Sequence, residues 1–157
     1  MEDIALYTVK HLAREGLKAA TAESCTGGLI AKMITDVSGS SGVFECGIVS
    51  YSNDIKHRIL GVKQETLDRY TEVSEQTVIE MAKGAVRISG ADIGVSVSGY
   101  AGPTADKDED VGLIWLACVY GDKCITAKIH NRFDSDVRNR NRLAAAEKAL
   151  SMINEII

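Results

Sequence analysis

The chain of 157 residues carries 18 basic and 22 acidic side chains, and its formal net charge is -4. This balance argues against binding to nucleic acid, which usually needs a basic face. The length predicts one domain, residues 1–157, that can bury its own core. The first residues are acidic, and no stretch approaches the roughly 18 apolar residues of a membrane helix. We therefore expect a cytoplasmic protein that does not contact membranes.

The four cysteines form no C-x-x-C pair, so a zinc site is not expected. Cys118 and Cys124 flank a predicted hairpin and could lie near each other. Cytosolic thiols are normally reduced, however, so we expect no functional disulfide between them.

Hydrophobic periodicity and turn residues divide the chain into eleven elements. Helices are expected up to residue 16 and over residues 29–37, 52–61, 63–70, 74–90 and 135–157. Strands are expected over residues 17–23, 43–50, 93–98, 111–120 and 123–130. The last two strands meet at Gly121-Asp122, which suits a type II′ hairpin. The pattern predicts an α/β fold, a three-layer α/β/α sandwich with a mixed, mostly parallel sheet.

Polar loops follow the first three predicted strands, at residues 24–28, 51–53 and 98–103. Ligands of open α/β sheets bind outside the carboxyl ends of the strands. If these strands are parallel neighbours, the three loops converge on one rim. We therefore place the candidate site there.

The first of these loops, residues 24–28, reads S-C-T-G-G and joins a strand to a helix. Its glycines permit tight turns and close approach to a ligand. The free N–H groups of a helix start can hold a phosphate or the oxyanion of acyl transfer. The alternative interpretation is a simple helix cap by Ser24 or Thr26. The loop matches neither the P-loop nor the dinucleotide-binding motif.

Ser24 needs a base to act as a nucleophile, and both Lys56 and His57 are nearby candidates. The sequence alone does not choose between them. Tyr51 could relay or donate a proton. Cys25 is a rival nucleophile, because a helix N-terminus lowers the pKa of a thiol. The alternative is that Cys25 is a small buried side chain.

Four arginines lie late in the chain, at positions 132, 138, 140 and 142. An arginine at the start of the last helix could grip a phosphate or carboxylate of a substrate. The alternative is a solvated helix face.

Residues 21–28 read T-A-E-S-C-T-G-G and resemble the signature of the CinA C-terminal domain family. Residues 98–103, S-G-Y-A-G-P, resemble that family's [ST]-G-I-A-G-P loop. Further matches fall in the family's order and spacing at residues 39–41, at 51–53 with Lys56, and at 60–62, 73–75 and 111–112 with Trp115.

The resemblance implies an α/β/α fold and, for stand-alone members, hydrolysis of the carboxamide of nicotinamide mononucleotide to nicotinate mononucleotide and ammonia. It implies no metal and no cofactor, and it implies self-association into a homodimer or larger assembly. It also implies that Ser24 is the nucleophile, Lys56 the general base and Tyr51 a proton relay. It places Ser98 and Arg138 at the substrate. From the loops themselves we add Cys25, Thr26, Gly27, Gly28 and Gly99 as substrate-binding residues.

Two segments depart from the family pattern. Residues 104–110 are acidic where the family loop is rich in glycine, and the family's G-D-R element is altered at residues 134–138. Acidic side chains near a phosphorylated substrate are unfavourable unless the loop points away. The alternatives to the deamidase are therefore an amidase for another small amide, or a nucleotide-binding or competence- and damage-related interaction module.

Overall fold

The sheet at the centre of the molecule has five strands in the order β2-β1-β3-β4-β5, in a computed structural model that describes residues 2–157. Its strands are β1 (Ala19–Glu23), β2 (Phe44–Val49), β3 (Ile93–Gly99), β4 (Leu113–Tyr120) and β5 (Lys123–His130). β1 pairs in parallel with β2 and β3, whereas β4 is antiparallel to both β3 and β5. Four strands therefore run in one direction, which confirms the predicted mixed sheet.

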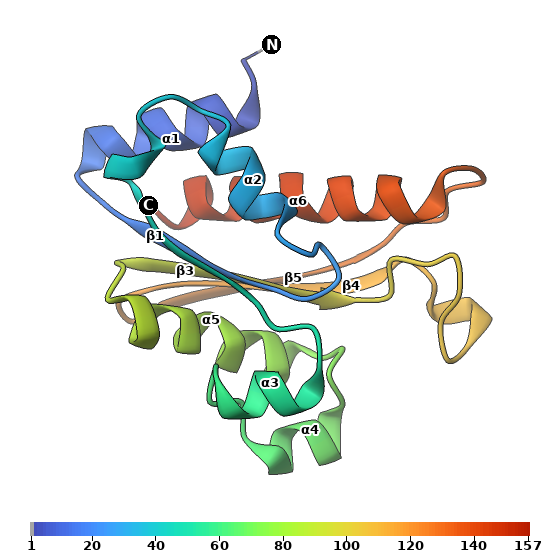
Figure 1. Cartoon of the computed structure of the whole chain (residues 1–157). Coiled ribbons are helices and arrows are strands. Elements are labelled where there is room, and N and C mark those ends of the chain that lie inside the picture. Colours follow the sequence, from blue (N-terminus) through green and yellow to red (C-terminus); the bar gives the residue numbers. More distant parts are fainter. Residues whose placement is uncertain (1) are drawn as a thin grey trace.

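Helices cover both faces of this sheet, as Figure 1 shows. One layer contains α1 (Ile4–Glu15), α2 (Leu29–Thr35) and α6 (Val137–Ile156). The opposite layer contains α3 (Asn53–Arg58), α4 (Gln64–Tyr70) and α5 (Glu75–Ser89). Two short 3₁₀ helices span Ser40–Gly42 and Asp108–Asp110. The predicted three-layer α/β/α sandwich is confirmed.

Local signals explain where the helices begin and end. Asp3 caps α1 by accepting from the backbone N–H groups of the first turn, and Gly16 ends the helix with a left-handed φ of 68°. Ser74 caps α5, and Gly90 ends it at a φ of 71°. Gly121 has a positive φ of 57° at the β4–β5 turn, as a type II′ hairpin requires.

The hydrophobic core lies in two parts, one on each side of the sheet. Leu12, Ile30 and Leu150 pack on the side of α1, α2 and α6, and Val78 and Met81 pack on the side of α5. The central strands β1 and β3 are buried almost throughout because helices cover both of their faces. The core therefore fixes two of the three strands that lead into the candidate site.

The two cysteines of the β4–β5 hairpin lie on opposite faces of the sheet. Cys118 is opposite Ile125 and Cys124 is opposite Val119, so the two side chains alternate across the pleat. Both are free thiols, as expected, and Cys118 is buried while Cys124 is exposed. No helix within residues 2–157 combines the length and the apolar character needed to cross a bilayer.

Candidate active site

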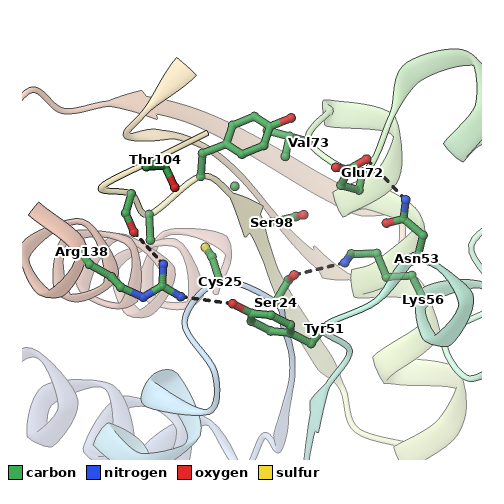
Figure 2. A pocket seen from close by; sticks show the side chains of 14 residues that line it. Ser24, Cys25, Tyr51, Asn53, Lys56, Glu72, Val73, Ser98, Thr104 and Arg138 are labelled. Atoms are coloured by element: carbon green, nitrogen blue, oxygen red, sulfur yellow. Dashed lines mark hydrogen bonds between the residues drawn. The ribbon is translucent and has the colours of Figure 1, made fainter. Parts of the chain in front are cut away.

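The loops after β1, β2 and β3 meet in one pocket of about 260 Å³ at the carboxyl ends of these strands (Figure 2). The three strands are parallel neighbours, so their carboxyl ends share one edge of the sheet. The pocket is lined by Ser24, Cys25, Tyr51, Asn53, Lys56, Glu72, Val73, Ser98, Gly99, Tyr100, Ala101, Gly102, Thr104 and Arg138.

Ser24 and Lys56 form a contact on the floor of this pocket. The Nζ atom of Lys56 lies 3.1 Å from Ser24 Oγ, and it donates to the carbonyl oxygen of Ser50 at 3.1 Å. Ser24 is 8% exposed and Lys56 is 1% exposed. The carbonyl oxygen of Ser50 can accept one N–H of a neutral Lys56 amine, and the lone pair of the amine then faces the hydroxyl of Ser24. The geometry is that of a nucleophile and its base.

Burial lowers the pKa of the Lys56 ammonium below its usual value, against the opposing charges of Glu72 and Cys25. The neutral amine, which is the form that can accept a proton, is therefore more populated near neutral pH than in an exposed lysine. The rival base, His57, faces elsewhere, because its Nδ1 lies 2.7 Å from the carbonyl oxygen of Val62. Of the two candidates, the fold brings Lys56 to Ser24.

A buried carboxylate accepts hydrogen bonds from the serine loop and from the first turn of α2. Glu23 is 1% exposed and accepts from the Thr26 hydroxyl at 2.6 Å, from Ile30 N at 2.9 Å and from Ala31 N at 3.0 Å. Neither Ser24 nor Thr26 caps α2, whose N-cap is Gly28 with no side-chain hydrogen bond. The cap interpretation was therefore wrong in its residues, because the carboxylate at the end of β1 satisfies these N–H groups instead.

This arrangement also decides which backbone N–H groups of the loop are free. Gly27 N donates to Ser24 O at 3.0 Å, and Leu29 N donates to Thr26 O at 3.0 Å. Within residues 2–157, the N–H groups of Cys25, Thr26 and Gly28 donate to no backbone carbonyl and to no side chain of another residue. Of these, only Cys25 belongs to a residue that lines the pocket.

Thr26, Gly27 and Gly28 are not part of the pocket wall, and their contact with a substrate stays a prediction. The two glycines take left-handed φ values of 60° and 101°, so they shape the turn that presents Ser24.

Cys25 lies beside Ser24 with only 6% of its surface exposed. Burial raises the pKa of its thiol to about 11, although its own backbone N–H and the charges of Arg138 and Arg142 act in the opposite direction. The expected lowering by a helix N-terminus does not prevail, because burial outweighs it and the charge of Glu23 adds a smaller effect in the same direction as burial. These properties match the small buried side chain and not a reactive thiolate.

Arg138 and Tyr51 form the opposite side of the pocket. Arg138 donates from Nη1 to the carbonyl oxygen of Gly102 at 2.7 Å and from Nη2 to the hydroxyl of Tyr51 at 3.1 Å. Tyr51 is 62% exposed. Its only side-chain hydrogen bond within the described residues is to Arg138, and none joins it to Ser24 or Lys56.

The other three arginines of the late basic run lie outside the pocket. Arg132 donates to Glu109 O, Arg140 stacks on Phe133, and Arg142 donates to Thr26 O. Arg142 thus supports the serine loop from α6 without reaching the pocket.

Ser98 and Gly99 at the end of β3 line the pocket wall. Ser98 is 1% exposed, and its hydroxyl forms no hydrogen bond with another residue in the described range 2–157. A Cβ atom on Gly99 would lie 2.6 Å from Ile114 Cα, so only glycine fits between β3 and β4 there.

The acidic loop departs from the family pattern without lining the site. Of residues 104–110, only Thr104 reaches the pocket wall, whereas Asp106, Asp108 and Glu109 are exposed. None of the carboxylates of this loop lines the pocket, although the charges of Asp106 and Asp110 still act on Tyr100 in the pocket wall. Their effect on a phosphorylated substrate stays a prediction.

Sequence reasoning missed Glu72 and Val73, which lie outside the three predicted loops, and it gave no role to Asn53 and Tyr100 within those loops. Glu72 follows α4 in a turn with no motif, and it accepts from Asn53 Nδ2 at 3.5 Å. Burial raises the pKa of Tyr100, with added effects from Glu72, Asp106 and Asp110. Among residues 2–157, no three His, Cys, Asp or Glu side chains gather in a way that could hold a metal ion.

The chain is similar in sequence to proteins of different lengths. It is 50% identical over 137 residues to the nicotinamide-nucleotide amidohydrolase PncC of Enterobacter agglomerans, covering 86% of this chain and 82% of that protein. It is 58% identical over 113 residues to a CinA-like protein of Akkermansia muciniphila, covering 71% of this chain and 27% of that protein. It is 43% identical over 157 residues to a CinA-like protein of Kosmotoga olearia, covering 99% of this chain and 37% of that one. The chain thus spans about a third or less of the length of these CinA-like relatives.

Solved structures show the same fold. The competence/damage inducible protein CihA from Agrobacterium tumefaciens superposes with a TM-score of 0.91 at 39% identity, covering 97% of this chain and 92% of that one. The model of the CinA C-terminal domain family matches residues 1–157. The chain therefore belongs to the CinA C-terminal domain family.

Proposed function

We propose that this protein is a serine amidohydrolase that converts nicotinamide mononucleotide to nicotinate mononucleotide and ammonia. The observation that carries the proposal is the 3.1 Å contact between Ser24 Oγ and Lys56 Nζ on the floor of a pocket. The name of the Enterobacter relative, which is 50% identical, supports the substrate. The cytoplasmic location, the self-association and the independence of metal and cofactor stay predictions.

The first chemical step transfers a proton within the buried pair. The neutral amine of Lys56 takes the hydroxyl proton of Ser24, and Oγ attacks the carboxamide carbon. Burial of Lys56 favours this step because it lowers the pKa of the ammonium toward the working pH.

The negative charge that develops on the carboxamide oxygen needs a donor nearby. The N–H of Cys25 is the free backbone donor of the serine loop that belongs to a pocket-lining residue. We assign it to the oxyanion. Lys56 then returns its proton to the leaving nitrogen, ammonia departs, and water hydrolyses the ester on Ser24.

The far side of the pocket holds the rest of the substrate. Two of the five N–H donors of Arg138 are used by Gly102 O and Tyr51, which leaves three for the substrate phosphate. The Tyr51 hydroxyl accepts from Arg138, so its own proton is free for the relay that we propose for it. The free hydroxyl of Ser98 faces the same space (Figure 2).

The test is ammonia release from nicotinamide mononucleotide by the purified protein and by Ser24→Ala, without added metal. We expect turnover by the wild type and a loss of at least ~10³-fold in the variant. Ser151→Ala, an exposed change on α6, is the matched control and should behave as the wild type.

Other outcomes would redirect the assignment. Substantial deamidation by Ser24→Ala would exclude the serine mechanism. A folded wild type that releases ammonia only from other amides would indicate a different amidase. Tight nucleotide binding without hydrolysis would indicate a binding module.

A further inference from the structure

Glu72 brings a carboxylate to the pocket wall, where the mechanism above gives it no part. It is half-buried, and its one side-chain hydrogen bond comes from Asn53 Nδ2, at the long distance of 3.5 Å. Within residues 2–157, none of the ion pairs involves Glu72. The pocket therefore contains a carboxylate with no cation of the protein directly beside it.

The backbone fixes the position of this carboxylate. Thr71, the preceding residue, has a φ of 68° and a ψ of 176°, which is unfavourable for a β-branched side chain. Its carbonyl oxygen accepts from the hydroxyls of Ser74 at 3.0 Å and of Thr77 at 2.7 Å. These bonds hold the turn between α4 and α5 in the conformation that turns Glu72 and Val73 toward the pocket.

The pocket is thus charged differently at its two ends. Glu72 lies on the side of Lys56 and Asn53, whereas Arg138 lies on the other side, with Ser24 and Ser98 between them (Figure 2). The charge of Glu72 reaches the reactive centre, since it opposes the lowering of the pKa of Lys56 by burial.

We propose that Glu72 is a specificity-determining residue that selects amides with a positively charged ring next to the scissile carboxamide, while Arg138 holds an anionic group at the other end. This inference rests on the proposed function. It extends that function by naming the charge pattern of the substrate. A pyridinium ring carries a delocalised positive charge close to its carboxamide. A half-buried carboxylate attracts this charge more strongly than a carboxylate in bulk water does, because the effective dielectric constant of the site is lower. A neutral ring of the same shape gains nothing from Glu72.

Binding can be measured apart from catalysis in the Ser24→Ala background. The probes are nicotinamide mononucleotide and its 1,4-dihydro form, which keeps the carboxamide, ribose and phosphate but has a neutral ring. Dissociation constants from calorimetric titration give the preference for the cationic ring. The comparison is between Ser24→Ala and Ser24→Ala with Glu72→Gln. Ser24→Ala with Glu65→Gln is the control, because it makes the same charge change at an exposed site on α4.

We expect Glu72→Gln to reduce the preference for the cationic ring by about tenfold, through weaker binding of the cationic form alone. The Glu65 control should leave the preference unchanged. A preference that stays within twofold, or an equal loss for both ligands, would overturn the inference, because it would assign Glu72 a structural role. Absence of ammonia release by the wild type, with the preference still dependent on Glu72, would sink the proposed hydrolysis and leave this inference standing.

Discussion

The floor and the rim of the pocket are built by different means. On the floor, Ser24 and Lys56 are at most 8% exposed, and Glu23 beneath them is 1% exposed. On the rim, Tyr51 is 62% exposed, and its partner Arg138 is exposed as well. Removing the partner of a buried polar group costs much free energy, whereas removing one member of an exposed pair costs little. The floor should therefore govern whether the reaction occurs, and the rim should govern which amide reacts.

The largest effect on the reaction is expected from a change at Lys56 on the floor. We expect both Lys56→Met and Lys56→Arg to lower kcat by ~10³-fold or more, because neither side chain can accept the proton of Ser24 near neutral pH. Lys56→Arg keeps the positive charge, so it separates a base from a fixed cation. Lys63→Met, at an exposed position before α4, is the control. Near-normal turnover in Lys56→Arg would contradict the role of base.

The pH dependence follows from the direction of the pKa shift at Lys56. In the wild type, kcat/KM should rise with pH through the lowered pKa of Lys56, because the neutral amine is the active form. The folded state should also gain stability between that pKa and about 10.4, the value expected for an unfolded lysine, since the unfolded chain binds more protons in this window. Denaturant titrations at several pH values should show this gain in the wild type and not in Lys56→Met.

A smaller effect is expected for Glu23, which lies beneath the floor and does not line the pocket. In Glu23→Gln, the new amide NH₂ would face a backbone N–H that now donates to a carboxylate oxygen, either Ile30 N or Ala31 N. We expect a loss of about 1–3 kcal/mol in the free energy of unfolding. We also expect a lower kcat, because the serine loop loses its support.

The control for Glu23 lies at the other end of α2. Asp36→Asn removes an exposed ion pair with Lys32, and it should cost at most about 0.5 kcal/mol. Equal denaturation midpoints for Glu23→Gln and Asp36→Asn would mean that the buried carboxylate does not support the loop.

The same division between floor and rim describes what the sequence could predict. The serine loop and Lys56 follow the carboxyl ends of β1 and β2, so strand patterns alone placed both at the same edge of the sheet. The choice between Lys56 and His57 could not be made, because neighbouring residues point about 100° apart on a helix and the rotation of α3 was unknown. The carboxylate of Glu23 was hidden because an acidic residue at a strand end usually points to solvent.

The rim was harder to predict because its residues come from turns. Glu72 reaches the pocket only through the left-handed φ of Thr71, which is neither glycine nor asparagine and so gave no turn signal. The acidic residues of the 104–110 loop suggested carboxylates beside the substrate phosphate, but none of these carboxylates lines the pocket. Strand and helix periodicity report which side chains are buried, but they do not report the direction of a turn.

The smallest effect is expected for Cys25, which is adjacent to Ser24 and shares its pocket. With a pKa of about 11, on the order of one thiol in ten thousand is ionised at pH 7. A nucleophile or base contributes about a hundredfold or more, so Cys25→Ala should change kcat by less than about threefold if the thiol has neither role. The proposed donor is the backbone N–H of Cys25, which the alanine variant retains.

Iodoacetamide should modify the exposed Cys124 well before the buried Cys25. Loss of turnover in Cys25→Ala with turnover kept in Ser24→Ala would move the nucleophile from the hydroxyl to the thiol. The floor of the pocket would then activate the Cys25 thiol in place of the Ser24 hydroxyl, although Cys25 is buried.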